Sequence, residues 1–385
     1  MNVDISCAKD LFEKLVESQL ARCKKMAADG DFIDYGKLDK LIIGVCGGDG
    51  IGPTITASAE TVLRSLLLDE VVAGKVEFRE IEGLTIENRI AKGKAIPDEI
   101  LCELKKCHVI LKGPTTTPDA GDGGPNVGSA NVAMRRELDL FANVRPVKLP
   151  SEGIDWTFFR ENTEGAYAVG DRGIDMDGLS LDFTITTDEG TKRIARLAYE
   201  YARNNKKKRV SIITKANVIK KTDGKFLRLC NEIGREYPEI TTDDWYADIL
   251  TAKLIDNARR TMFEVIVLPN LYGDIITDEA AQIQGGVGTA GSANIGKHYA
   301  MFEAIHGSAP RMVEENRTAY ADPCSMLRAT VMLLNHIGRP DKAAILERAL
   351  DICMFEDKKM AITGRDDGCT CAQFTDYVIG TMKTL

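Results

Sequence analysis

Hydrophobic positions along this chain form short runs that are separated by amphipathic stretches. The segments with strand character are LIIGVC (41–46), KVEFREIEG (75–83), CHVILKGP (107–114), RVSIITKAN (209–217) and MFEVIVLPN (262–270). Segments with helical periodicity lie between many of them, notably ITASAETVLRSLLL (55–68), DEGTKRIARLAYEYARNN (188–205) and DGKFLRLCNEIGREY (223–237). This alternation predicts an α/β protein with a large parallel or mixed sheet.

The N-terminal segment predicts a helix ahead of the first strand. Residues 8–28 place Leu11, Leu15, Leu20 and Met26 among charged side chains, which is the pattern of an amphipathic helix. We interpret this segment as an extension that packs on the protein or forms an oligomer contact. It contains acidic residues and no apolar core segment, so we expect neither a secretory signal nor a transit peptide.

A glycine-rich turn follows the first predicted strand. GDGIG occupies residues 48–52, and a dinucleotide-binding G-x-G-x-x-G pattern would need a glycine where the chain has Pro53. The spacing therefore predicts a tight strand-to-helix turn, not a Rossmann fingerprint.

Composition and charge narrow the class of protein. The 385 residues suggest two domains, and 58 acidic against 50 basic residues give a net charge of −8. We expect no nucleic-acid partner, because such partners select basic surfaces. No apolar run reaches 18 residues, so we expect no membrane span. The ten cysteines share no metal-ligand spacing, which predicts free thiols and a cytoplasmic location.

Two aspartates stand four residues apart in NLYGDIITDEA (270–280). If this stretch is helical, Asp274 and Asp278 share one face and repel each other by a few tenths of a kcal/mol. A bound dication would offset that repulsion, and hard carboxylate oxygens suit Mg²⁺ or Mn²⁺. The alternative is that the two aspartates bind no metal and are simply acidic residues near a helix N-terminus, where the helix dipole stabilises negative charge.

Three arginines and two further groups complete the candidate chemistry. Arg135, Arg145 and Arg160 suggest recognition of a polyanion, because guanidinium groups donate paired hydrogen bonds to carboxylates and phosphates. Taken one at a time, each arginine is more often a solvated or ion-paired surface residue. Lys215 at a strand end and Tyr167 are candidates for proton transfer.

Six ordered motifs carry a specific resemblance. GDGIGP, SANVAMRRELDLFANVRP, FRENTEGAYA, TKANVIKKTDG, NLYGDIITDEAA and FEAIHGSAP resemble the β-decarboxylating dehydrogenases, which include isocitrate, isopropylmalate and homoisocitrate dehydrogenases. The resemblance runs from about residue 41 to 325 and implies the fold of that family. That fold has two α/β domains around a cleft and is not a Rossmann fold.

The resemblance also implies a domain division and an assembly. A large domain would combine residues 41–140 and 286–385, a small domain with the dimer contact would span 141–285, and 1–40 would be a helical extension. The active site would be shared between the two subunits of a homodimer.

By resemblance, each candidate residue receives a role. Asp274 and Asp278, with Asp248 from the neighbouring subunit, would hold Mg²⁺ or Mn²⁺. Lys215 would accept the proton of the substrate hydroxyl, and Tyr167 would protonate the enol left after CO₂ departs. The substrate-binding residues would be Ser129, Asn131, Arg135, Arg145 and Arg160.

The substrate side group is read just before Arg135. Ser129 and Asn131 match the Ser-x-Asn-x-x-x-Arg spacing of isocitrate enzymes and can hydrogen-bond a third carboxylate. Isopropylmalate enzymes present an apolar wall at this point. The insertion DAGDGGPNVG before Ser129 keeps homoisocitrate open, and tartrate is a further alternative.

The resemblance implies a nicotinamide cofactor, NADP or NAD. Arg311 after the loop proline favours NADP, because NAD enzymes usually carry an aspartate there, yet the tyrosine typical of NADP enzymes is replaced by Met312. Asp322 stands where the family usually has an adenine-facing asparagine. The expected cofactor contacts are Lys112, Thr117, Asn217, His306, Gly307, Ser308, Ala309, Arg311 and Asp322.

Two interpretations without catalysis remain beside the enzyme. One is a regulatory subunit of an isocitrate dehydrogenase complex, although such chains commonly lose the groups that are present here. The other is a structural protein that binds a metal or an anion. Turnover by the isolated chain would exclude both.

Overall fold

The computed structural model describes residues 5–118, 127–170, 172–286 and 288–385. Its contacts divide the chain into two compact units. Unit 1 comprises Met1–Asp31 and Phe141–Ala280, and unit 2 comprises Phe32–Leu140 and Ala281–Leu385. The domain division implied by the family resemblance stays a prediction, and each unit is described by itself.

Unit 2 is built on a mixed sheet with the strand order β2-β1-β3-β12-β11. All neighbours are parallel except β11 and β12, which run antiparallel. The strands are β1 (Leu41–Cys46), β2 (Val76–Glu80), β3 (Val109–Lys112), β11 (Gly291–Ile295) and β12 (Ala300–Ala304). The predicted strands at 41–46, 75–83 and 107–114 are thereby confirmed.

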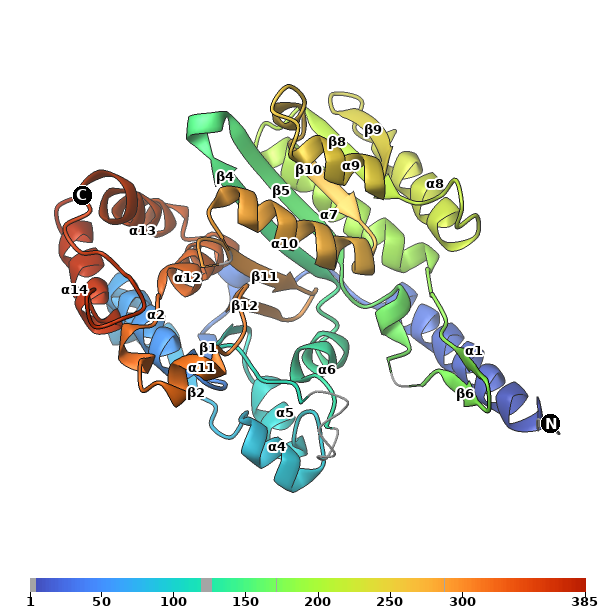
Figure 1. Cartoon of the computed structure of the whole chain (residues 1–385), viewed down its shortest axis with the longest axis horizontal. Coiled ribbons are helices and arrows are strands. Elements are labelled where there is room, and N and C mark those ends of the chain that lie inside the picture. The colour runs from blue at the N-terminus through green and yellow to red at the C-terminus, as the bar shows by residue number, and fades with distance from the viewer. Residues whose placement is uncertain (1–4, 119–126, 171, 287) are drawn as a thin grey trace. The chain divides into compact units, whose positions relative to one another are not determined.

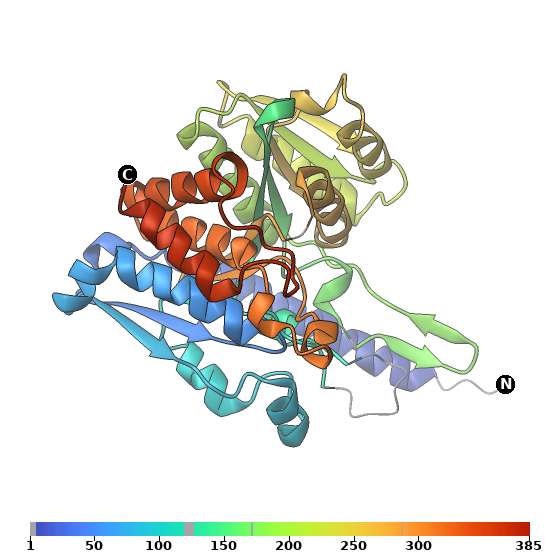
Figure 2. The ribbon, with the colours of Figure 1, turned by 60° about the vertical axis from the view of Figure 1, so that its left-hand side comes forward.

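Helices cover the sheet of unit 2 on both sides, as the blue and teal elements of Figure 2 show. They are α2 (Gly52–Leu66), α3 (Leu68–Val72), α4 (Ile86–Lys92), α5 (Asp98–Leu104), α6 (Ala130–Glu137), α11 (Pro310–Glu314), α12 (Cys324–His336), α13 (Pro340–Asp351) and α14 (Cys371–Met382). Helices α2 and α12 contact the strands, while α14 packs on α2. Buried residues of α5 and α6, including Leu104 and Met134, pack against Ile110 and Met301 of the sheet.

The main strands of unit 1 follow the order β4-β5-β10-β8-β9 in a mixed arrangement. Only β4 and β5 are antiparallel within it. The strands are β4 (Ala142–Leu149), β5 (Ile154–Glu161), β8 (Arg209–Thr214), β9 (Thr241–Tyr246) and β10 (Val265–Leu268). In both units helices alternate with parallel strands along the chain, so the α/β class predicted from the apolar runs is confirmed.

Figure 1 shows the helices of unit 1 around these strands. They are α1 (Ile5–Ala28), α7 (Asp188–Asn204), α8 (Thr222–Gly234), α9 (Ala247–Leu254) and α10 (Asn270–Gln284), whose last turn lies beyond the unit boundary. A hairpin of β6 (Ile174–Met176) and β7 (Leu179–Leu181) extends beside α1 in Figures 1 and 2. Helix α1 confirms the predicted N-terminal helix, and the Phe12 ring lies 5.5 Å from that of Phe183.

Within the described part of the chain, no helix is both long and apolar enough to cross a bilayer. The ten cysteines carry free thiols, as predicted.

The GDGIG turn joins β1 to α2 through left-handed glycines. Gly48 and Gly50 have φ values of 73° and 62°, a region that L side chains rarely adopt. The amides of Asp49 and Ile51 donate to the carbonyls of Pro114 and Ser308 at 2.8 and 3.0 Å. These amides are therefore used to join three loops of unit 2, which agrees with the predicted tight turn.

A buried ion pair crosses two neighbouring strands of unit 2. Lys112 and Glu303 are directly paired residues of β3 and β12, and the Lys112 ammonium lies 2.9 Å from the Glu303 carboxylate. Arg135 and Asn294 also contact that carboxylate, at 3.5 and 2.7 Å. Burial alone would raise the pKa of Glu303, but Lys112, Arg135 and the Asn294 hydrogen bond outweigh burial and lower it to about 2.

Gly50→Ala tests the turn. The added methyl would lie 2.0 Å from the Ser308 carbonyl oxygen and would require a left-handed alanine. We expect a loss of stability of at least about 1–3 kcal/mol from backbone strain, measured by urea unfolding. Gly224→Ala is the matched control, because that helical position has open space around it and alanine favours helix. Equal stability of both variants would contradict the role given to the turn.

Glu303→Gln tests the buried pair. At pH 7 it leaves Lys112 buried without its counter-charge, so we expect a loss of about 3–5 kcal/mol in unfolding free energy. Because the folded pKa is depressed, this stabilisation is present above about pH 4.5 and is lost as pH falls toward 2. The gap between wild type and variant should therefore narrow in acid.

The exposed pair of Lys40 and Glu77 supplies the control for that experiment. Glu77→Gln should change the urea midpoint very little at any pH, because exposed pairs contribute little. A Glu303→Gln variant as stable as wild type at pH 7 would refute the account of the pair.

Candidate active site

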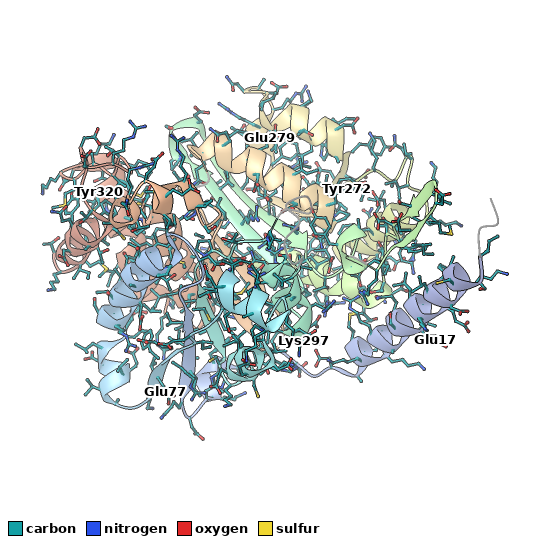
Figure 3. The ribbon with its side chains drawn as sticks, turned by 60° about the horizontal axis from the view of Figure 1, so that its bottom comes forward. Glu17, Glu77, Tyr272, Glu279, Lys297 and Tyr320 are labelled. Carbon is teal, nitrogen blue, oxygen red and sulfur yellow. The ribbon has the colours of Figure 1, made fainter. Side chains whose placement is uncertain are left out.

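The start of helix α10 organises the candidate site in unit 1. The helix begins at Asn270, immediately after β10 and Pro269, and its first turns carry Asp274 and Asp278 on one face, as predicted. Tyr272 and Glu279, both labelled in Figure 3, bracket these two aspartates along the helix. A Cβ at Gly273 would lie 2.4 Å from the Arg160 side chain, so glycine lets that arginine lie against the helix.

Arg160 connects β5 to both ends of this first turn. Its side chain is only 1% exposed. Its Nε and Nη2 donate to Asn270 Oδ1 at 3.1 and 2.7 Å, and its Nη1 donates to Asp274 Oδ1 at 2.5 Å. The Tyr167 hydroxyl donates to the other oxygen, Asp274 Oδ2, at 2.9 Å. Arg160, Tyr167 and Asp274 are thus gathered by direct hydrogen bonds.

Arg145 holds the second aspartate. It projects from β4, and its Nη1 donates to Thr277 Oγ1 at 2.6 Å and to Asp278 Oδ1 at 2.8 Å. The arginine is buried, whereas the Asp278 side chain is 59% exposed. Each carboxylate of the pair therefore has one arginine partner, and this reduces the repulsion between them.

The oxygen donors of α10 fit a hard dication only in part. Asp274 and Asp278 both retain exposed surface and offer carboxylate oxygens, the ligands that Mg²⁺ and Mn²⁺ prefer. Among the described residues, however, no group of three His, Cys, Asp or Glu side chains is close enough to hold a metal ion. Among the described residues of α10, Asp274 and Asp278 are the two carboxylates that share this face.

Asp248 pairs with Lys215. Lys215 directly follows β8, Asp248 lies in the first turn of α9, and Lys215 Nζ donates to Asp248 Oδ1 at 2.5 Å. This hydrogen bond lowers the pKa of Asp248. The backbone amide of Lys215 donates to the buried Asp223 at 2.7 Å, which fixes the end of the strand. The structure thus brings together the predicted base and the predicted partner-derived ligand.

The predicted side-group residues lie at the start of α6 in unit 2. Ser129 is the N-cap, and its hydroxyl accepts from the Val132 amide at 3.4 Å. Thr115 donates to Asn131 Oδ1 at 3.1 Å. Arg135, one turn later, reaches Glu303. Residues 119–126 of the insertion before Ser129 lie outside the described residues.

The predicted cofactor residues differ widely in their surroundings. Lys112 is fully buried in its pair with Glu303, whereas Thr117 and Asn217 are exposed. The buried Ser308 hydroxyl lies 2.7 Å from Thr116 Oγ1, and Ala309 adopts a left-handed φ of 49°.

The rest of the loop lies closer to solvent. His306 Nδ1 lies 3.0 Å from the Gly307 carbonyl, which exposes the ring beside the glycine. Arg311 is 81% exposed and donates to Glu315 at 2.6 Å. Asp322 accepts from the Cys324 amide at 2.8 Å, just before the start of α12. The assignment of this loop to a cofactor stays a prediction.

Sequence reasoning missed several residues of these networks. Asn270 is almost fully buried and accepts two hydrogen bonds from Arg160. Thr277, Asn294 and Glu303 had no assigned role. Asn270 opens the NLYGD motif and Glu303 lies in FEAIHGSAP, so the motifs themselves contained the signal.

Comparisons with known proteins agree with this architecture. The chain is 40% identical over 313 residues to isocitrate dehydrogenase (NADP) of Rickettsia prowazekii, an overlap of 78% of this chain and 61% of that protein. It is 33% identical over 375 residues to the probable isocitrate dehydrogenase (NAD) subunit alpha, mitochondrial, of Caenorhabditis elegans, which covers 95% and 99% of the two chains. The chain thus spans less than two thirds of the bacterial relative's length.

A solved structure of an isocitrate dehydrogenase has a fold similar to that of this chain. Isocitrate dehydrogenase from Methylococcus capsulatus superposes with a TM-score of 0.78 at 34% identity, covering 89% of this chain and 99% of that one. The model of the family described as isocitrate/isopropylmalate dehydrogenase matches residues 42–378. The predicted non-Rossmann fold class is confirmed, and this chain belongs to the isocitrate/isopropylmalate dehydrogenase family.

Proposed function

We propose that this chain is an isocitrate dehydrogenase that oxidises and decarboxylates isocitrate to 2-oxoglutarate and CO₂ with reduction of NAD(P)⁺. The observation that carries the proposal is the aspartate pair of α10, held by Arg160 and Arg145, with Tyr167 on the same carboxylate as Arg160. The names of relatives from bacteria and animals support the same substrate. We also propose a cytoplasmic location, which the ten free thiols support.

The arginines would bind and orient the substrate. Arg135, Arg145 and Arg160 carry fixed positive charge, and their burial and ion pairs hold the guanidinium groups in defined orientations. A trianionic substrate would share these donors with Glu303, Asp278 and Asp274. Holding the substrate in one orientation lowers the entropic cost of the reaction.

Two groups of the chain are suited to the proton transfers. Lys215 would take the proton of the substrate hydroxyl while the carbinol hydrogen leaves as hydride. Tyr167 would return a proton to the carbon from which CO₂ departs, and its hydroxyl is already oriented by Asp274. When bound, a divalent cation at Asp274 and Asp278 would polarise the substrate hydroxyl. When bound, NAD(P)⁺ would accept the hydride.

Ser129 and Asn131 would select isocitrate within the family. Thr115 occupies the amide oxygen of Asn131, which orients the amide nitrogen as the donor for a third carboxylate. A substrate with an isopropyl group would leave these polar groups without partners, which is costly in a binding site. Homoisocitrate would also satisfy them and is the second candidate.

The incomplete metal site supports a dimer. Because no third carboxylate joins Asp274 and Asp278 among the described residues, we propose that Asp248 of a second copy completes the site, with Lys215 entering beside it. A partner of the same family but different sequence would serve equally, because the worm relative is named as a subunit.

Steady-state kinetics test the function directly. We expect isocitrate turnover with Mn²⁺ by the isolated chain, and a much lower kcat/KM for isopropylmalate and homoisocitrate. Turnover of homoisocitrate alone would replace the substrate assignment. No turnover of any of the three acids would favour a regulatory subunit over an enzyme.

Asp274→Asn tests the α10 site. The amide keeps the shape but loses the charge that a cation and Arg160 require, so we expect kcat to fall by about 100-fold or more. Asp256→Asn is the control, because that aspartate follows α9 and pairs with Lys253 at 3.2 Å. Near wild-type kcat in Asp274→Asn, with Mn²⁺ saturating, would remove Asp274 from the site.

Arg311 and Glu315 test the cofactor preference. Arg311→Asp should lower the NADP/NAD ratio of kcat/KM by about tenfold or more, because an aspartate repels a 2′-phosphate. Glu315→Gln removes the carboxylate that holds Arg311, so the ratio should rise. Unchanged ratios in both variants would show that Arg311 does not read the cofactor.

A further inference from the structure

Arg22 of the N-terminal helix reaches the loop that follows β5. Its Nη1 donates to Glu164 Oε1 at 2.9 Å, and its Nη2 donates to Thr163 Oγ1 at 2.8 Å. The Glu164 side chain is 3% exposed, so its charge has little access to water. A buried carboxylate without a cationic partner is costly. Helix α1 therefore supplies this loop with a positive charge.

The loop contains a second buried carboxylate. Glu161 accepts hydrogen bonds from the Thr163 amide and hydroxyl and, at 2.6 Å, from the Glu164 amide. Burial and the nearby charge of Glu164 raise the pKa of Glu161 to about 7. Arg193 of α7 also donates to the Thr163 hydroxyl, at 3.1 Å. Arg22 thus contacts a compact turn in which two acidic side chains lie close together.

Glu164 is joined to the candidate active site through its backbone. Its carbonyl oxygen accepts from Asn270 Nδ2 at 3.0 Å, and Asn270 Oδ1 in turn holds the Arg160 guanidinium. Arg160 and Tyr167, which stand on either side of this turn in sequence, both bond Asp274. The backbone of Glu164 is therefore linked to Asp274 through Asn270 and Arg160, and the Tyr167 hydroxyl bonds the same aspartate.

The carboxylate of Glu164 also fixes the start of α7. It accepts from the Thr187 amide at 2.9 Å and from the Thr187 hydroxyl at 2.5 Å, and Thr187 is the N-cap of that helix. Three elements distant in sequence thus converge on one side chain: α1, α7 and the loop after β5. Among the described residues, the guanidinium that contacts this carboxylate comes from α1.

We propose that Arg22 is a positioning residue for the active site, acting through Glu164 and Asn270 on Arg160, Tyr167 and Asp274. The N-terminal helix then belongs to the catalytic apparatus and is not only an addition to it. Without Arg22, the buried Glu164 carboxylate loses its ion pair while it lies beside Glu161, and the turn must shift. This inference rests on the proposed function.

Arg22→Gln is the primary test, with kinetics and Mn²⁺ binding measured well below the unfolding temperature. We expect kcat/KM for isocitrate to fall by about tenfold or more, because small displacements of positioned groups are costly to catalysis. Mn²⁺ affinity, measured by electron paramagnetic resonance with and without isocitrate, should weaken as well. Arg22→Lys should restore much of both, since it returns the charge.

Lys25→Gln is the matched control, because Lys25 lies one turn away on the exposed side of the same helix. It should leave kcat/KM and Mn²⁺ affinity unchanged. Unchanged kinetics and Mn²⁺ affinity in Arg22→Gln, with only a lower unfolding temperature, would overturn the proposal and leave Arg22 as an anchor for α1.

A second variant and a binding measurement allow the proposal to be tested even if Arg22→Gln does not fold or the wild type is inactive. If Arg22→Gln fails to fold, Thr163→Val removes the hydroxyl that Arg22 and Arg193 both contact, and it should give the same loss in milder form. If wild type does not turn over isocitrate, the proposed function fails, yet Mn²⁺ affinity still reports on Asp274. Equal Mn²⁺ affinity in wild type, Arg22→Gln and Thr163→Val would then overturn the positioning role.

Discussion

Burying the Arg160 guanidinium imposes the constraint on which the candidate site depends. A buried cation must be surrounded by acceptors, and here one amide and one carboxylate of α10 provide them. This requirement fixes the start of the helix against β5 and demands a glycine at position 273. It also orients Asp274, whose second oxygen receives the Tyr167 hydroxyl. One charged side chain thus determines the geometry of strand, helix and loop.

Unit 2 also surrounds a buried charge with polar partners, but there the buried charge is negative. There the buried anion, Glu303, is central, and Lys112, Arg135 and Asn294 converge on it from two strands and a helix. In both units side chains supply the partners of the buried charge, and these partners belong to the same unit as the charge.

The sequence predicted those parts of the fold that depend on local pattern. Strands such as β3 and β10 are buried along their whole length and are read directly from their apolar runs. Strands β4 and β9 were not predicted, because Pro146 interrupts the first and the second is the polar segment TTDDWY. Their strand character comes from pairing with β5 and β8, which one-dimensional periodicity does not contain.

The candidate site divides in the same way. Motifs identified the chemical groups, and the i, i+4 spacing predicted that Asp274 and Asp278 share a helix face. The hydrogen-bond partners could not be predicted from local spacing, because they are distant in sequence. Arg145 lies 133 positions from Asp278, and Arg22 lies 142 positions from Glu164. Only the folded chain shows that Lys215 and Asp248 pair, or that the N-terminal helix reaches the loop carrying Tyr167.

The two aspartates and two arginines around α10 have a further consequence for the order of events. Their four formal charges cancel, so under the proposed function electrostatics would favour neither a free dication nor a free tricarboxylate strongly. A dication already chelated by the proposed substrate would bring its own compensating charge and would disturb this neutrality far less than either ion alone. Electroneutrality would therefore favour joint binding of metal and acid, and such a site would discriminate against unchelated ions without any dedicated gate.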